Sequence, residues 1–446
     1  MKKLILIKKK LSIYKKNSIK VEGDKSLSIR FIILSSLSTG KSLASNILKS
    51  EDTISVINIL KKLGIKIKLN NNNCEVKGKG LFGYKFKKNL VLDAGNSGTT
   101  ARLLLSTLID SNYKIKITGD KSLKKRDMNR VVKPLKQFGA KIKSNKGKLP
   151  IFITGSKLLK PIRYKENLGS AQSKSAVLIA ALKTKGKTKL YCLPSRNHTE
   201  LMFKNILKVP IKIKKRSKDE IIQVNGLNEF KSFNYRIPGD ISSASFFIVL
   251  TLISKNKTLI IKNVNVNPSR TGIIKILNRM GAKIKLLNLK IYKGEKIADI
   301  FVRSNQNLKP INLEPKLNSS AIDEFLLIFL VASTCKGISS FKKLSELNKK
   351  ESKRLDWGVR ILNQIGIKTK KIKNQGIKIW GKQSLNLNKT YVIKNYLKDH
   401  RVFMTATIAG LALGGNWKIY DPNSFKTSFP SFLKILRDLG AKIEIK

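Results

Sequence analysis

The sequence predicts an α/β protein of two halves, each holding three copies of one helix-and-strand unit. Two observations lead to this prediction. Six times along the 446 residues, an amphipathic helix pattern ends at a small stop and continues as a short alternating strand. Six further helix patterns are apolar on nearly every side. The copies lie too far apart for a solenoid, whose repeats span about 20–50 residues, so each copy is a small α/β unit.

The amphipathic helices share one apolar stripe followed by a stop. In the first copy, the stripe and its stop are Val56, Ile57, Leu60, Leu63 and Gly64. A glycine at this place supplies the left-handed backbone that ends many helices. The following strand alternates apolar and polar residues, which indicates one buried face. The stops of the other copies are Gly139, Pro210, Gly281, Gly366 and Gly440.

The second kind of helix is apolar all round, which is typical of the interior of a large soluble protein. The six segments are IRFIILSSL, TARLLLSTLI, SAVLIAAL, SASFFIVLTLI, AIDEFLLIFLVAS and FMTATIAGLALG. None reaches the roughly 18 uninterrupted apolar residues that indicate a membrane span. We therefore expect six buried helices and six half-exposed ones.

The two halves are recognised by a repeated motif. GDKSLSIRF at 23–31 has a counterpart, GDISSASFF, at 239–247. A length of 446 residues fits two domains with ample core. We expect an N-terminal lobe of residues 23–236, and a C-terminal lobe of residues 1–22 together with 237–446.

The composition is strongly basic, with 92 Lys and Arg against 27 acidic residues and a formal charge of +65. Such a balance normally suggests nucleic acid as a partner. Here the lysines are spread along the whole chain without a dense tract, which favours compositional drift instead. Three cysteines without close spacing indicate neither a disulfide framework nor a zinc site. The apolar run near the N-terminus is too short for a signal peptide, so a cytoplasmic location is expected.

Functional side chains gather at the starts of the buried helices. In the first half, these starts hold Gly-Asp-Lys-Ser at 23–26, Asn-Ser-Gly-Thr-Thr at 96–100 and Ser-Ala-Gln-Ser at 170–173. Free N–H groups at such starts suit an anion. In the second half, they hold Asp-Glu at 323–324 and Asp-His-Arg at 399–401, with Lys-Glu-Ser-Lys-Arg at 350–354. These are acid–base groups and cation clamps. A cleft between the halves would suit small, multiply anionic substrates, and no cofactor or metal motif is present.

The motifs GDKSLSIR, GNSGTTARLL, ITGDKSLKKRDMNRVVKPL, SAQSKSAVLIAAL, SRNHTE, NPSRTG, IDEF, KESKRL, DHR and TSFP resemble those of 5-enolpyruvylshikimate-3-phosphate synthases from end to end. The resemblance implies a two-domain inside-out α/β barrel, with three βαβαββ repeats in each domain. It implies transfer of the enolpyruvyl group of phosphoenolpyruvate to the 5-hydroxyl of shikimate 3-phosphate, with release of phosphate. It also implies a monomer that needs no cofactor and serves aromatic amino-acid biosynthesis.

The resemblance further assigns roles to individual residues. The residues implied to bind shikimate 3-phosphate are Lys25, Ser26, Arg30, Ser170, Ala171, Gln172, Asp323 and Lys350. The residues implied to bind phosphoenolpyruvate are Lys25, Gly98, Arg126, Gln172, Arg354 and Arg401. Asp323 matches the base that takes the proton of the 5-hydroxyl, and the other catalytic groups are Glu351, Lys25 and His400. Lys353 stands where the family motif has Asp, which predicts a disturbed ion pair at Arg354.

Two other functions remain open from the sequence. The related transferase that loads enolpyruvate onto UDP-N-acetylglucosamine typically uses a cysteine on a mobile loop, and residues 118–130 contain none. An RNA-binding or RNA-end-processing protein on a similar repeat would explain the charge of +65. It would not explain the ordered set of motifs.

Overall fold

The computed structural model describes residues 3–373, 375–385 and 387–446, and four residues of the expected domain ranges lie outside it. The described chain forms two compact units. The N-terminal unit contains Gly23–Ile237 and Tyr292–Glu295. The C-terminal unit contains Met1–Glu22, Pro238–Ile291 and Lys296–Lys446. Six four-stranded sheets are present in the described residues, and all have the same strand order.

The second repeat of the N-terminal unit shows this order directly. Its elements are β6 (Val91–Asp93), α3 (Gly98–Thr107), β7 (Ile115–Thr118), α4 (Asn129–Gln137), β8 (Lys141–Asn145) and β9 (Lys148–Thr154). The sheet runs β6-β7-β9-β8, with β6 parallel to β7 and the remaining pairs antiparallel. This is a βαβαββ repeat, which confirms the fold class predicted from the sequence.

The other repeats of the N-terminal unit follow the same scheme. The first contains α1 (Lys25–Ser36), β3 (Thr39–Ser45), α2 (Glu51–Lys62), β4 (Lys66–Asn70), β5 (Asn73–Lys79) and β14 (Asn234–Arg236). The third contains β10 (Arg163–Glu166), α5 (Ala171–Ala181), β11 (Lys187–Cys192), α6 (His198–Asn205), β12 (Ile211–Lys215) and β13 (Glu220–Asn225).

The C-terminal unit also has three repeats. The first contains β2 (Ser18–Lys20), α7 (Ile241–Ile253), β15 (Thr258–Asn265), α8 (Gly272–Arg279), β16 (Ile284–Tyr292) and β17 (Glu295–Arg303). The second contains β18 (Asn312–Leu313), α9 (Asn318–Ala321), α10 (Phe325–Ser333), β19 (Gly337–Phe341), α11 (Arg354–Gln364), β20 (Lys368–Ile372) and β21 (Gly376–Gly381). The third contains β22 (Thr390–Ile393), α12 (His400–Leu413), β23 (Asn416–Tyr420), α13 (Phe432–Asp438), β24 (Glu444–Ile445) and β1 (Leu4–Ile7).

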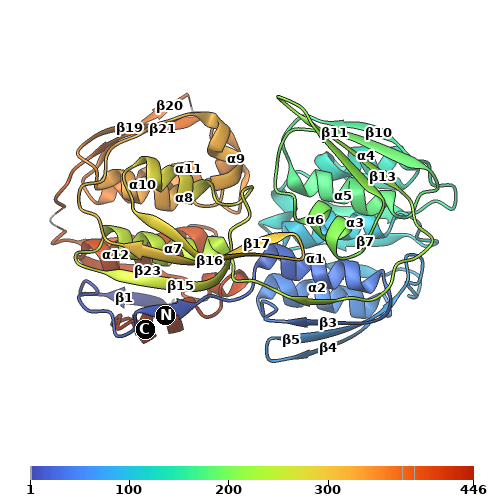
Figure 1. Cartoon of the computed structure of the whole chain (residues 1–446), viewed down its shortest axis with the longest axis horizontal. Coiled ribbons are helices and arrows are strands. Elements are labelled where there is room, and N and C mark those ends of the chain that lie inside the picture. The colour runs from blue at the N-terminus through green and yellow to red at the C-terminus, as the bar shows by residue number, and fades with distance from the viewer. Residues whose placement is uncertain (1–2, 374, 386) are drawn as a thin grey trace. The chain divides into compact units, whose positions relative to one another are not determined.

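Strands from the ends of the chain segments complete three of the sheets. The strand β2 pairs in parallel with β15, and β14 pairs in parallel with β3, so each opens a repeat whose other elements are distant in sequence. The strand β1 pairs with β23 and β24 and stands blue among the red elements of Figure 1. Gly23 begins the N-terminal unit, and a Cβ there would lie 1.9 Å from the carbonyl oxygen of Asn46. Only glycine fits this close backbone approach.

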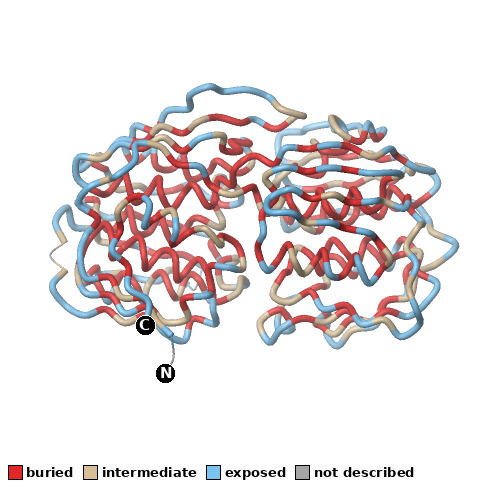
Figure 2. Tube along the Cα trace, turned by 90° about the horizontal axis from the view of Figure 1, so that it is seen from below, coloured by how far each residue is buried: buried red, intermediate tan, exposed pale blue. Residues whose placement is uncertain are grey.

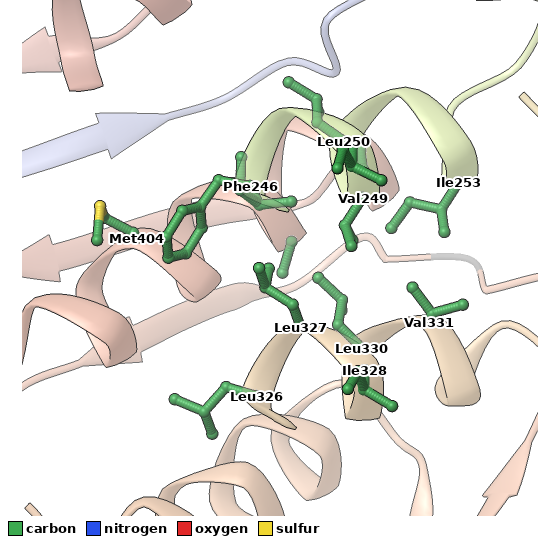
Figure 3. Packing of buried hydrophobic residues seen from close by; sticks show 14 of the residues in the cluster. Phe246, Val249, Leu250, Ile253, Leu326, Leu327, Ile328, Leu330, Val331 and Met404 are labelled. Carbon is green, nitrogen blue, oxygen red and sulfur yellow. The ribbon is translucent and has the colours of Figure 1, made fainter. Parts of the chain in front are cut away.

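The core of each unit lies on its apolar helices, as predicted. Every residue of α7 and of α10 is buried. Buried residues concentrate on the helices of each unit in Figure 2. In Figure 3, Phe246 and Val249 of α7 lie opposite Leu327 and Leu330 of α10. Among the described residues, no helix combines the length and the apolarity that crossing a membrane requires.

The helix stops match the sequence prediction in five copies and differ in the third. Five of the predicted glycines have φ angles between 78° and 112°. In the third copy, the prediction of Pro210 is wrong, because α6 ends at Asn205 and Lys208 takes the left-handed conformation with φ of 55°. Proline cannot adopt a positive φ, so the stop falls on the nearest residue that can.

Candidate active site

The site residues expected from the sequence all lie at or near the starts of helices. In the N-terminal unit, Lys25 begins α1, Gly98 begins α3, and Ser170 caps α5. In the C-terminal unit, Arg354 begins α11 and His400 begins α12. The remaining expected residues and their places are Ser26 and Arg30 in α1, Arg126 after a short turn at Leu123–Lys125, Ala171 and Gln172 in α5, Asp323 between α9 and α10, Lys350 and Glu351 before α11, and Arg401 in α12.

An ion pair and two hydrogen bonds link the N-terminal halves of α1, α3 and α5. Lys25 Nζ lies 3.0 Å from Asp52 Oδ2, and the Asp52 carbonyl accepts a hydrogen bond from Thr100 in α3 at 3.5 Å. The Arg30 side chain crosses to Ser175 of α5, with an Nη2–Oγ distance of 2.9 Å. These contacts hold three helix N-termini together. The positive ends of their dipoles therefore act on one region of the unit.

Two arginines approach the start of α3. A Cβ added at Gly98 would lie 2.9 Å from Arg102 Nη1 and 3.1 Å from Arg126 Nη1. Arg126 donates to Asn96 Oδ1 at 2.7 Å, while Arg102 donates to Gln172 Oε1 at 2.6 Å. The absence of a side chain at position 98 gives both guanidiniums access to the helix start. Together with the backbone N–H groups of α3, they form a site suited to a phosphate-sized anion.

Gln172 connects the starts of α3 and α5. Its amide nitrogen donates to Thr99 Oγ1 at 2.9 Å, and its oxygen accepts from Arg102. Arg102 also donates to the carbonyl of Asp127, which follows Arg126 in the chain. Arg102 therefore joins Gln172 to the loop of Arg126.

In the C-terminal unit, three carboxylates surround Arg354. Its Nε lies 2.9 Å from Asp399 Oδ2, its Nη1 lies 3.3 Å from Asp323 Oδ1, and its Nη2 contacts Glu351. Arg354 is 2 % exposed, and burial lowers its pKa. The three carboxylates more than offset this effect, so the pKa of Arg354 lies above its usual range. The guanidinium is therefore a fixed positive charge in a fixed orientation.

These contacts concern the expected effect of Lys353 on Arg354 and the expected grouping of the site residues. Lys353 was expected to disturb the ion pair of Arg354, but Arg354 is held by Asp399, Glu351 and Asp323. The Lys350 ammonium lies 3.2 Å from Asp323 Oδ1, so Asp323 contacts two cations. Four of the expected site residues therefore form one cluster.

Arg401 and His400 lie beside this cluster, at the start of α12. Asp399 accepts the backbone N–H of Arg401 at 2.9 Å, which fixes the first turn of the helix. Arg401 is 8 % exposed, and its ion pair with Glu324, from Nη1 to Oε1, is long at 3.5 Å. Within the described residues, its buried Nε atom has no hydrogen-bond partner. His400 Nδ1 lies 3.3 Å from Thr427 Oγ1.

Comparison with known proteins identifies the family. The model of the EPSP synthase (3-phosphoshikimate 1-carboxyvinyltransferase) family matches residues 13–436. The chain belongs to the EPSP synthase family. A 3-phosphoshikimate 1-carboxyvinyltransferase of Ruthia magnifica subsp. Calyptogena magnifica is 39% identical over 429 residues, which cover 96% of each chain. Another, from Caldicellulosiruptor bescii, is 40% identical over 427 residues, covering 95% of this chain and 96% of the relative.

A solved EPSP synthase from Acinetobacter baumannii has the same fold. Its TM-score is 0.85 at 33% identity, over 99% of this chain and 100% of the solved chain. The resemblance predicted from the motifs is thus confirmed. So is the assignment to transferases and to enolpyruvyl transfer in the shikimate pathway, which is the activity of this family. The RNA-binding alternative receives no support from these matches.

Sequence reasoning on this EPSP synthase family member missed a chain of buried groups in the C-terminal unit. Arg270 donates to Ser242 Oγ at 2.8 Å and pairs with Asp240 at 3.2 Å. Ser242 donates to Glu324 Oε1 at 2.5 Å, and Glu324 contacts Arg401. This series of contacts links Arg270 to Arg401, which was predicted to be a site residue. Its members stand in the quoted motifs GDISSASFF, NPSRTG and IDEF, so the signal was present without an assigned role.

Proposed function

We infer that this chain transfers the enolpyruvyl group of phosphoenolpyruvate to the 5-hydroxyl of shikimate 3-phosphate and releases phosphate. The observation that carries the inference is the family match over residues 13–436. The two substrates bring together between about five and six negative charges, counting each phosphate as −1.5 to −2. Cations and helix N-termini in each unit supply the compensating positive charge.

The N-terminal unit is proposed to bind the two phosphates. The phosphate of phosphoenolpyruvate would bind to Arg126, to the backbone at Gly98 and to Gln172. The reason is that the guanidiniums of Arg126 and Arg102 both reach the start of α3. Shikimate 3-phosphate would bind to Ser170 and Ala171 at the start of α5. Further groups proposed for it are Lys25, Ser26 and Arg30 of α1. Lys25 would also contact phosphoenolpyruvate.

The C-terminal unit is proposed to hold the reacting carboxylate and move the protons. Arg354 and Arg401 would clamp the carboxylate of phosphoenolpyruvate, and the buried Nε of Arg401 has donor capacity for it. Lys350 would contact shikimate 3-phosphate beside Asp323, with which it pairs at 3.2 Å.

The proposed reaction proceeds by addition and elimination. Asp323 takes the proton of the 5-hydroxyl as its oxygen attacks carbon 2 of phosphoenolpyruvate. Carbon 3 gains a proton, with Lys25, Glu351 and His400 as the proposed acid–base groups. Loss of phosphate and of a proton from carbon 3 then restores the double bond. Each positioned acid or base typically contributes about 10²–10⁴-fold. We propose that the chain acts as a cytoplasmic monomer, with these small molecules rather than nucleic acid as its partners.

A phosphate-release assay with both substrates tests the function. We expect Asp323→Ala and Arg126→Ala to lower turnover at least about 100-fold, since each removes a base or a charge clamp. Glu314→Ala and Arg163→Ala are the matched controls, because both side chains are exposed. Wild-type release without shikimate 3-phosphate, or equal rates in all four variants, would contradict the assignment. Retention of RNA at physiological salt with no phosphate release would favour the RNA-binding alternative.

A further inference from the structure

The N-terminal unit contains a cavity of about 760 Å³ at the opposite ends of the helices that carry the candidate site. Leu108 in its wall directly follows α3, and Lys183 lies two residues after α5. Tyr84, also in the wall, donates to or accepts from Ser36, the last residue of α1, at 2.8 Å. At 1.5 Å per residue, helices of 10 to 12 residues separate the cavity from the candidate site by roughly 15 Å.

Aromatic side chains form much of the wall. Phe82, Tyr84, Phe86 and Tyr113 are four of the fifteen lining residues, whereas aromatic residues make up 7% of the chain. The rings of Phe86 and Tyr113 lie 6.2 Å apart in an edge-to-face arrangement. Phe82 is 57% exposed and Tyr113 is 41% exposed, so their ring surfaces are open to solvent. Exposed rings around a concave surface offer stacking faces to a planar ligand.

The floor of the cavity is charged. The Lys183 ammonium donates to Asp110 Oδ1 at 2.5 Å and to the Thr107 carbonyl at 2.7 Å, and its side chain is 1% exposed. It also lies 5.5 Å from the ring centres of both Phe82 and Tyr84. An ammonium has three donors, so one remains after these two hydrogen bonds. Burial lowers the pKa of Lys183, and Asp110 opposes this by raising it.

The charge of the lining favours an anion. Four lysines stand against one carboxylate, Asp110, and the three besides Lys183 are Lys85, Lys157 and Lys185 at the exposed rim. The abundance of lysine in this chain is enough to explain the three exposed lysines at the rim. It does not explain a buried lysine in contact with two rings. The aromatic walls and the buried ammonium together specify a ligand more closely than charge alone.

We propose that this cavity binds a small aromatic carboxylate, with its ring against Phe82, Tyr84, Phe86 and Tyr113 and its carboxylate at Lys183 and the rim lysines. A volume of about 760 Å³ is within the range of small-molecule sites, about 300–1,000 Å³. The site is separate from the enolpyruvyl-transfer site. The proposal does not depend on the proposed function.

Benzoate is the probe for this site. We expect the full-length chain to bind it with a Kd of about 1 mM or tighter, measured by calorimetry or saturation-transfer NMR. Cyclohexanecarboxylate has the same charge without an aromatic face, and benzylamine has the ring with the opposite charge. Both should bind at least about 5-fold more weakly. Equal affinity for benzoate and cyclohexanecarboxylate would overturn the aromatic part of the proposal.

Variants locate the binding site. Tyr113→Leu and Phe86→Leu keep an apolar side chain and should weaken benzoate binding about 5- to 10-fold without changing phosphate release. Lys183→Met should abolish binding, and Lys124→Met, an exposed lysine elsewhere, is its control. Arg126→Ala should leave benzoate binding unchanged. Loss of binding in Arg126→Ala with full binding in Tyr113→Leu and Phe86→Leu would place benzoate at the candidate active site and refute the proposal.

Discussion

The two units hold their arginines in different ways. In the N-terminal unit, Arg102 and Arg126 are oriented by neutral oxygens of Gln172 and Asn96. In the C-terminal unit, Arg354 is oriented by three carboxylates. The two amide oxygens fix the directions of Arg102 and Arg126 through hydrogen bonds. The carboxylates fix the direction of Arg354 and also offset its charge.

The largest expected effect is that of replacing Asp399, which contacts the side chain of Arg354 and the backbone of Arg401. Asp399 is fully buried and accepts from Arg354, Ser352 and the backbone of Arg401. Asp399→Asn removes the ion pair between Asp399 Oδ2 and Arg354 Nε. We expect the free energy of unfolding in urea to fall by about 3–5 kcal/mol, as when a buried pair loses one partner. Asp438→Asn, at an exposed pair with Lys16, should change it by less than about 1 kcal/mol.

The corresponding substitution in the N-terminal unit, Gln172→Met, should lower the free energy of unfolding by less. Gln172→Met removes a neutral acceptor from Arg102 and leaves the size of the side chain nearly unchanged. Since Gln172 is only partly buried, we expect a loss of about 1–2 kcal/mol in the same urea titration. The exposed Gln137→Met serves as control. A loss as large as that of Asp399→Asn would remove the distinction between the two units.

A methyl group at the start of α3 tests the open approach to Arg102 and Arg126. In Gly98→Ala, the added Cβ would lie 2.9 Å and 3.1 Å from their Nη1 atoms, so both guanidiniums must shift. We expect KM for phosphoenolpyruvate to rise about 10-fold while kcat changes less than about 2-fold, because ground-state and transition-state binding weaken together. A large fall in kcat with constant KM would show that this region acts on the chemical step instead.

The smallest expected effect concerns salt. With a formal charge of +65, the positive side chains of the folded protein repel one another. Sodium chloride screens this repulsion and should raise the melting temperature by a few degrees. Inorganic phosphate at equal ionic strength should raise it further, because an anion that binds only the folded chain stabilises it. Arg126→Ala should remove this excess and keep the chloride effect. A flat response to both salts would contradict the electrostatic account of the N-terminal unit.

The sequence predicted much of the local structure. Gly64 and Gly440 stop their helices as expected, since a stripe of apolar residues and a following glycine act within a few turns of the chain. It failed at Pro210, where the left-handed residue is Lys208, because the degenerate copy gave no local glycine to mark the stop. The motifs also named the family, and the residues expected at the site lie at helix starts.

What only the tertiary structure decided is which distant groups meet. Arg354 and Asp399 are 45 residues apart, and Arg30 and Ser175 are 145 apart. Each contact depends on how the repeats within one unit pack together, which no local pattern records. The same holds for β2 and β14, which join repeats other than their neighbours in sequence. The periodicity of the sequence specified the six repeats by itself. Side-chain packing between repeats determined the partners of each charged group.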